Sequence, residues 1–155
     1  MHFHRAGLAI VLGWAAAMSS PLAHAALGGT IDTIQSDAVR MKAQARMIPS
    51  AAPAAYIVQE IRLASGTVVH EYANSAGTVF AVIWRGPQMP NLRQALGSYA
   101  SVLADAEAAH HLGHTHLIVD RPGVHIESNG HMRAFSGIAF VPALVPANVS
   151  VAELQ

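Results

Sequence analysis

Six short segments rich in β-branched and aromatic residues constrain the fold of this chain more than any other feature. They occur in two groups of three, namely residues 56–63, 67–73 and 78–84, then 115–120, 123–129 and 131–141. Turn-forming pairs such as Ser65-Gly66 and Asn129-Gly130 separate the members of each group, which is typical of tight hairpins. We therefore expect two antiparallel three-stranded meanders.

A helical pattern precedes each group of strands. After Thr30, a suitable N-cap, apolar residues recur at helical spacing and predict a helix over residues 31–47. After Asn91, an apolar stripe predicts a second helix, in which Gly97 suggests close packing against the sheet. The order α-β-β-β, repeated once, predicts a single α+β domain whose two units share a largely antiparallel sheet, with both helices on one face.

The first 25 residues have the organisation of a secretory signal peptide. Arg5 and two histidines precede an apolar run of about 13 residues, which is shorter than the roughly 20 needed to cross a bilayer. Ala23-His24-Ala25 has the small-x-small pattern of a signal peptidase site, so we expect cleavage after Ala25. Residues 26–155 would then form one exported domain, periplasmic or extracellular, with no transmembrane segment.

Composition excludes several classes of function. Loss of Arg5 would leave eight basic residues against nine acidic ones, a balance that gives no electrostatic footprint for nucleic acid. The chain has no cysteine, so thiol catalysis, cysteine zinc sites and disulfide stabilisation are excluded. We expect packing of apolar side chains alone to hold the domain together.

The stretch HHLGHTH, residues 110–116, contains four of the ten histidines and raises the question of a metal site. If the strands pair as expected, Leu117 and Val119 share one face with Val124 and Ile126. The opposite face then gathers the possible ligands of a zinc or copper ion, which are His114, His116, His125 and Glu127, with His111 as a further one. The alternative is an imidazole-rich connection beside an exposed sheet face, which we favour, so no cofactor is expected.

A second candidate site is the stretch SNGHMRAF, residues 128–135. A two-residue turn at Asn129-Gly130 would place Ile126 opposite Arg133 and leave His131 and Arg133 on one face. Such a pair can bind a carboxylate or a phosphate. The alternative is a hairpin end whose polar residues face water.

A third candidate is the stretch WRGPQMPNLRQ, residues 84–94. Trp84 at a strand end and Arg85 before a Gly-Pro turn could form the rim of a small-ligand site, with Arg93 beside it. The alternative is a strand-to-helix connection in which Trp84 and Met89 cover the core.

Motifs of catalysis do not occur. The chain has no GxSxG elbow, no phosphate-binding glycine loop and no dinucleotide fingerprint. Glu60 and Glu71 are the one carboxylate pair that neighbouring strands could bring close, and we expect their facing to be an accident of the solvent side. The sequence therefore favours a protein that is not an enzyme.

Four stretches carry a family resemblance, which are ALGGT, SGTVVHEY, GTVFAVIWRGPQMPNLRQALGSY and GHMRAF. They resemble the DUF2844 proteins, and the resemblance covers most of residues 26–155. It implies an exported bacterial protein of unknown function and brings no catalytic residue or cofactor. Our leading hypothesis is a small exported binding or interaction module of the bacterial envelope, with an unknown protein or small-molecule partner; the rival is a periplasmic metal-binding protein.

Overall fold

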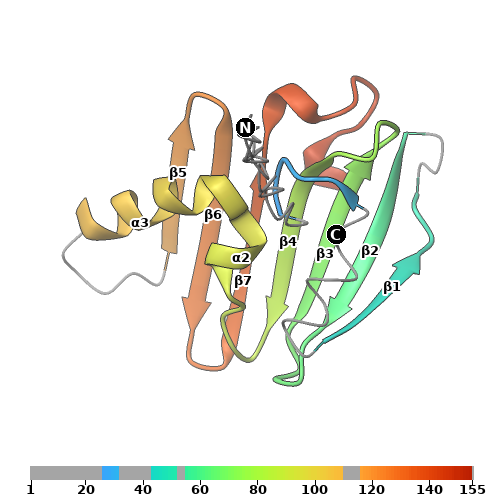
Figure 1. The fold of residues 1–155 in the computed structure, drawn as a ribbon. Coiled ribbons are helices and arrows are strands. Elements are labelled where there is room, and N and C mark those ends of the chain that lie inside the picture. The colour runs from blue at the N-terminus through green and yellow to red at the C-terminus, as the bar shows by residue number, and fades with distance from the viewer. Residues whose placement is uncertain (1–25, 32–42, 52–54, 110–115, 155) are drawn as a thin grey trace, which may run out of the picture.

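The computed structural model describes residues 26–31, 43–51, 55–109 and 116–154 of the chain. Within them, seven strands form one antiparallel sheet in the order β1-β2-β3-β4-β7-β6-β5 (Figure 1). The strands are β1 Gln44–Ile48, β2 Tyr56–Arg62, β3 Val68–Asn74, β4 Val79–Gly86, β5 His116–Arg121, β6 Val124–His131 and β7 Ala134–Phe140. The sheet and its helical layer confirm the α+β class.

Both predicted meanders are present. Strands β2, β3 and β4 follow one another as hairpins, as do β5, β6 and β7. The two meanders join through their last strands, because β4 pairs antiparallel with β7. All six strands predicted from the sequence are therefore confirmed, with small shifts at their ends.

The seventh strand corrects the prediction of a helix over residues 31–47. Gln44–Ile48 is an extended edge strand, β1, that pairs with β2 along its whole length. The helical spacing there depended on small or flexible side chains, and backbone pairing with β2 overrides such a weak preference. Residues 32–42, the rest of the predicted helix, lie outside the described residues, so the duplication of an α-β-β-β unit stays a prediction.

The predicted second helix begins where expected. The side chain of Asn91 accepts a hydrogen bond from the backbone N–H of Gln94 at 3.3 Å, and α2 Leu92–Leu96, η2 Gly97–Tyr99 and α3 Ala100–Ala109 follow. Gly97 has a φ of 54°, which interrupts the helix, and a Cβ there would lie 2.6 Å from the Cβ of Ala26. The lack of a side chain at Gly97 therefore allows close packing against the segment 26–31, whereas we expected close packing against the sheet. No described helix is long and apolar enough to cross a membrane.

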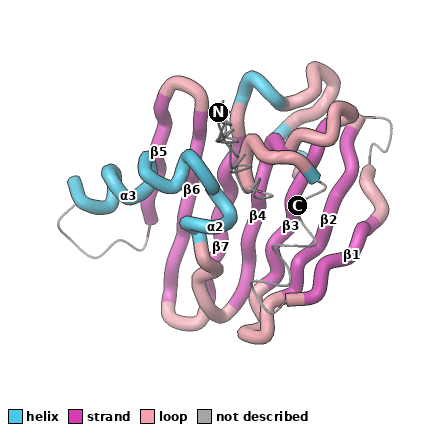
Figure 2. Tube along the Cα trace, viewed as in Figure 1, coloured by secondary structure: helices cyan, strands magenta, loops and turns pink. Residues whose placement is uncertain are grey.

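One face of the sheet and the helices enclose the larger core. Figure 2 shows α2 and α3 lying across β5, β6 and β7. Buried helix residues meet a continuous apolar surface on the sheet, formed by Ile61, Val69, Val82, Trp84, Leu117, Val119, Val124, Ile126 and Ala139. The predicted shared face of Leu117, Val119, Val124 and Ile126 is confirmed.

The C-terminal segment covers one end of the opposite face. It contains η3 Pro142–Leu144 and η4 Val151–Glu153, and it packs Leu154 against a second apolar cluster with Tyr56, Tyr72 and Phe80. The rings of Tyr56 and Tyr72 lie 5.7 Å apart, within the usual range for aromatic pairs. The other end of this face carries the polar residues described below.

The turn between β6 and β7 differs from the predicted one. Asn129 and Gly130 belong to β6, and Met132 and Arg133 form the two-residue turn. As a result, Ile126 lies opposite Ala139 and not opposite Arg133. The predicted register would have put a guanidinium group in the core, so the match of apolar residues on the buried face overrides the turn preference of Asn-Gly.

Candidate ligand-binding site

An open hollow of about 540 Å³ lies at the end of the sheet where β4 ends and the β6–β7 turn begins. We call it the hairpin hollow. Its lining is Arg85, Gly86, Pro87, Asn129, His131, Arg133, Ala134, Phe135 and Ser136. Its volume lies within the range of roughly 300–1,000 Å³ that small-ligand sites occupy.

Strand register sets three polar side chains of the hairpin hollow in one row. Arg85 of β4 lies opposite Ser136 of β7, and Ser136 lies opposite Asn129 of β6. Residues paired directly across neighbouring strands project to the same face, with about 4.8 Å between strands. A cation, a hydroxyl and an amide therefore lie side by side on the face that the helices do not cover.

The connection from β4 to α2 is held in place by the buried Thr67. The Thr67 hydroxyl donates to the carbonyl of Gln88 at 2.6 Å and accepts from the Gln88 N–H at 3.3 Å. At Gly86, a Cβ would lie only 2.4 Å from the Cα of Thr67, so this contact requires glycine. The contact fixes Gly86 and Pro87, which form one side of the hollow.

Arg133 has an unusual backbone conformation. Its φ of 63° makes it the one non-glycine residue with a positive φ among the residues that the structure describes. This left-handed region costs an L residue roughly 1 kcal/mol and favours glycine or asparagine. The turn therefore presents a guanidinium group at the hollow in spite of a conformational cost.

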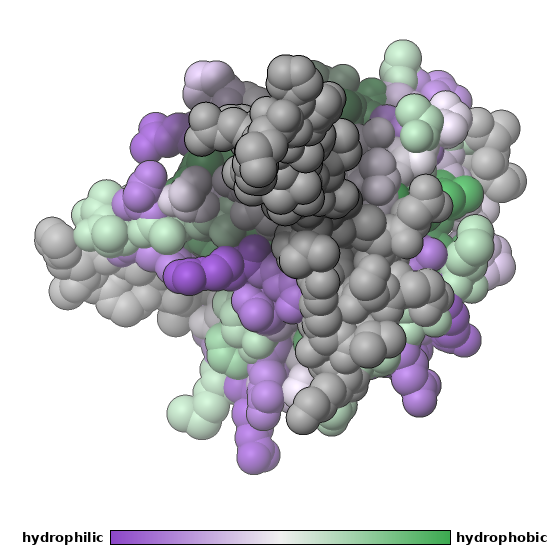
Figure 3. Space-filling model, viewed as in Figure 1, coloured by the Kyte–Doolittle hydropathy of each residue, from purple (hydrophilic) through white to green (hydrophobic). Residues whose placement is uncertain are grey.

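The charges at the hairpin hollow are of one sign. Arg85 and Arg133 are cations, His131 adds an imidazole, and none of the described lining residues carries a carboxylate. Glu127, on the same face of β6, accepts a hydrogen bond at 3.4 Å from the side-chain amide of Asn129. Figure 3, viewed from the helix-covered side, shows hydrophilic and hydrophobic residues side by side at the lower end of the molecule. Two arginines beside a histidine, with a serine and an asparagine, can bind a carboxylate or phosphate.

The structure brings together residues from two of the sites suggested by the sequence. His131 and Arg133 came from one stretch and Arg85 from another, and all three line the hairpin hollow. Trp84 does not join them, because its side chain is 1% exposed and packs in the helix-covered core. Trp84 therefore covers the core, as the alternative supposed, whereas Met89 is 40% exposed and does not. Arg93 of α2 is not among the lining residues.

Sequence reasoning missed Asn129 and Ser136 as part of the same site. Asn129 was assigned to a turn, which left it without a strand partner. Placing Met132 and Arg133 in the turn instead pairs Asn129 with Ser136, and Ser136 with Arg85. The signal that favours this register was present in the sequence, because it keeps Arg133 off the buried face.

A second hollow, of about 450 Å³, adjoins the first and shares Arg85 with it. We call it the tail hollow, because residues of the C-terminal segment form one wall. Its lining is Val68, His70, Ile83, Arg85, Ala152 and Leu154. Four of its six lining residues, Val68, Ile83, Ala152 and Leu154, are apolar.

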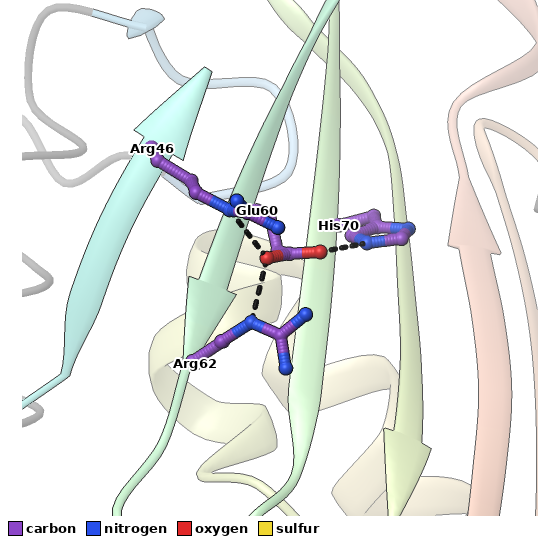
Figure 4. Close-up of polar contacts among 4 residues, drawn as sticks. All are labelled: Arg46, Glu60, Arg62 and His70. Atoms are coloured by element: carbon purple, nitrogen blue, oxygen red, sulfur yellow. Dashed lines mark hydrogen bonds and ion pairs between the residues drawn. The ribbon is translucent and has the colours of Figure 1, made fainter. Parts of the chain in front are cut away.

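A buried carboxylate lies beside the tail hollow. Glu60, on β2, is 6% exposed, and its Oε1 accepts from the Nε atoms of Arg46 at 2.8 Å and of Arg62 at 2.7 Å. Its Oε2 lies 3.3 Å from Nε2 of His70 (Figure 4). The hydrogen bond from Arg46, with those from Arg62 and His70, overcomes the opposing effect of burial and lowers the pKa of Glu60 to about 2. The carboxylate is therefore ionised and its charge is balanced.

Glu60 and Glu71 are not the solvent-side pair that the sequence suggested. Glu60 lies opposite His70, and Glu71 lies opposite Gln59, so the two carboxylates project to opposite faces of the sheet. Both are buried, and Glu71 lies on the helix-covered face with an exposure of 1%. They cannot act as a catalytic pair.

The histidines proposed as metal ligands are spread along the β5–β6 hairpin. His116 lies opposite Asn129, whose side-chain oxygen it contacts, whereas His125 lies opposite Asp120. Asn129 and His125 are four residues apart on β6, about 13 Å along the strand. Among the described residues, no three His, Asp or Glu side chains are grouped as metal ligands, and His111 and His114 lie outside those residues.

Fold and site together define a small α+β protein with a one-sided helical layer and an open, cationic sheet end. Residues 23–154 match the model of one family, described as a protein of unknown function, DUF2844, and the chain belongs to this family. The resemblance seen in the sequence is thereby confirmed. Comparisons with curated proteins and with solved structures gave no match.

Proposed function

We propose that this protein is an exported, non-catalytic binding module of the bacterial envelope, whose ligand presents a carboxylate or phosphate group to the hairpin hollow. The observation that carries the proposal is the convergence of Arg85, His131 and Arg133 on one hollow whose described lining has no carboxylate. Arginine is suited to such a ligand because its planar guanidinium donates two parallel hydrogen bonds to a carboxylate or phosphate.

Binding is a better account of this lining than catalysis. His131 supplies the one imidazole of the lining. Acid–base catalysis generally requires a positioned partner for such a group, and the other lining side chains are fixed cations or neutral. The conformational cost at Arg133 is consistent with a charge held ready for a ligand.

Export is supported by the part of the chain that follows the expected cleavage site. Ala26 and Leu27 are 4% and 2% exposed, and Leu27 donates a backbone hydrogen bond to Ala95 at 3.0 Å. A cut after Ala25 would therefore leave these two packed residues in the mature domain. We also propose that the two meanders belong to two related α-β-β-β units.

Calorimetric titration tests the proposed ligand class. Protein recovered after expression of the full-length chain is titrated with inorganic phosphate and with acetate at low ionic strength. We expect one site per molecule with a dissociation constant on the order of 0.1–1 mM, because the site is open to water. Each of Arg85→Gln and Arg133→Gln should weaken binding about fivefold, the effect of losing one charged hydrogen bond of roughly 1 kcal/mol at an exposed site.

Arg93→Gln is the matched control. Arg93 is an exposed arginine on α2 that does not line the hollow, so its loss should leave the affinity unchanged. Equal weakening in all three variants would indicate nonspecific attraction to positive charge and would contradict the proposal, as would the lack of saturable binding.

A further inference from the structure

The tail hollow extends the hairpin hollow along the same face of the sheet. Arg85 lines both, and its direct partner on β3, Val68, belongs to the tail hollow. Ile83 precedes Arg85 by two residues on β4 and therefore projects to the same face. A ligand bound at Arg85 on one side thus borders an apolar space on the other.

The walls of the tail hollow are suited to an apolar chain. Val68 and Ile83 line it from the sheet, and Ala152 and Leu154 line it from the C-terminal segment. Burying such surface against an apolar ligand is favourable, since it removes apolar area from water. The wall formed by the C-terminal segment favours a single ligand chain, because the surface of a bilayer would need a flat, unobstructed face.

Charge at the tail hollow does not oppose an anionic ligand. Both oxygens of Glu60 are engaged, by Arg46 and Arg62 on one side and by His70 on the other. The polar side chains that line the tail hollow are the imidazole of His70 and the guanidinium of Arg85, and neither carries a negative charge. The negative charge nearby is therefore balanced before any ligand binds.

We infer that the ligand is an amphipathic anion, with its carboxylate or phosphate head in the hairpin hollow and an unbranched acyl or alkyl chain in the tail hollow. This inference rests on the proposed function and deepens it, because it names the part of the ligand beyond the anionic head. Arg85 lies at the junction and contacts the head, and Ile83 and Leu154 contact the chain.

A chain-length series tests the inference. The protein is titrated with acetate, butanoate, hexanoate and octanoate, and with octyl phosphate and octanol, all as monomers in solution. We expect the affinity to rise about three- to fourfold for each added methylene that enters the tail hollow. Octyl phosphate should likewise bind more tightly than inorganic phosphate. Octanol, which lacks a charge, should bind at least tenfold more weakly than octanoate.

Variants separate the two parts of the site. Ile83→Gln, at a half-buried position, and Ala152→Phe, which fills the hollow from the tail side, should abolish the gain with chain length and leave acetate binding unchanged. Ile118→Gln is the matched control, since Ile118 is an exposed isoleucine on the same face of the sheet in β5. It should preserve the whole series.

The outcomes are distinguishable from failure of the proposed function. Equal affinity for acetate and octanoate would overturn the amphipathic ligand and leave the anion site intact, whereas loss of all binding would remove both. Binding to vesicles with anionic lipid without binding to octanoate or octyl phosphate would also overturn the inference, in favour of a membrane surface.

Discussion

Gly137 lies directly opposite Trp84 across the β4–β7 ladder, and the indole ring fills the space where a side chain at position 137 would stand. A Cβ there would be 2.2 Å from Cζ2 of Trp84 and 2.4 Å from the carbonyl oxygen of Glu127. This contact joins the two meanders and keeps Trp84 on the buried face. Arg85, the next residue, consequently projects to the open face and reaches the hairpin hollow.

Gly137→Ala should therefore destabilise the protein by roughly 3 kcal/mol, since neither an indole in the core nor a backbone carbonyl can give way at low cost. Urea unfolding followed by tryptophan fluorescence measures the change. Gly130→Ala is the graded control, because its Cβ would meet only the ring of Phe135, at 3.2 Å. If Gly137→Ala lowers the free energy of unfolding no more than Gly130→Ala does, the contact with Trp84 is not tight.

Arg133→Gly should raise stability and lower affinity together. Glycine adopts the φ of 63° without strain, so we expect a gain of about 0.5–1 kcal/mol in the free energy of unfolding. The same change removes a guanidinium from the hollow and should weaken phosphate binding about fivefold. Denaturant unfolding and calorimetry measure the two effects.

Met132→Gly is the comparison within the same turn. Met132 is 95% exposed and does not have a positive φ, so glycine there should bring no relief of strain and no change in phosphate affinity. A stability gain at position 132 that matches the gain at 133 would argue against strain at Arg133.

Glu60→Gln should lower the free energy of unfolding of the protein by about 1–2 kcal/mol at neutral pH. Solvent screening limits the effect, because Arg46 and Arg62 are 63% and 57% exposed and remain solvated. The folded-state pKa of about 2 lies below the usual 4.5, so the contribution is complete above about pH 4.5 and is lost as the pH falls towards 2. The difference between wild type and variant should shrink over that window.

Thermal unfolding at several pH values between 2 and 7 checks this prediction. The control is Glu107→Gln, which changes an exposed carboxylate on α3. Its stability should differ little from that of the wild type at every pH. A gap between wild type and Glu60→Gln that persists unchanged at pH 2 would contradict the assigned role of the carboxylate.

Export predicts a defined N-terminus. Protein recovered from the envelope or medium after expression of the full-length chain should begin at Ala26, as read by intact mass and N-terminal sequencing. The Ala25→Arg substitution should block processing, because signal peptidase requires a small side chain at this position. Unprocessed wild-type chain in the cytoplasm would contradict export.

Strands were more predictable here than the helix at the start of the domain. Six strands carried β-branched and aromatic residues between clear turn signals, and these local preferences agreed with the final pairing. In β1, alanine, glutamine and methionine have little strand preference of their own. The strand exists because β2 offers a free edge and Glu60 offers a partner to Arg46, and both depend on tertiary structure.

Parts of the site followed from sequence, but their assembly did not. His131, Arg133 and Arg85 were identified by residue type, yet nothing local placed them together. Their meeting depends on the β4–β7 pairing and on a turn three residues beyond the Asn129-Gly130 pair. The tail hollow depends on contact between β3, β4 and residues 152–154, which no short stretch could predict.

The most direct test of an anion site at the hairpin hollow is a titration of isotope-labelled protein with inorganic phosphate, followed by amide chemical shifts. We predict saturable shifts that cluster at residues 85–87 and 129–136. These shifts should disappear in the double variant that combines Arg85→Gln and Arg133→Gln. Shifts centred instead on α2 around Arg93, or no saturable shifts up to about 50 mM phosphate, would contradict the account.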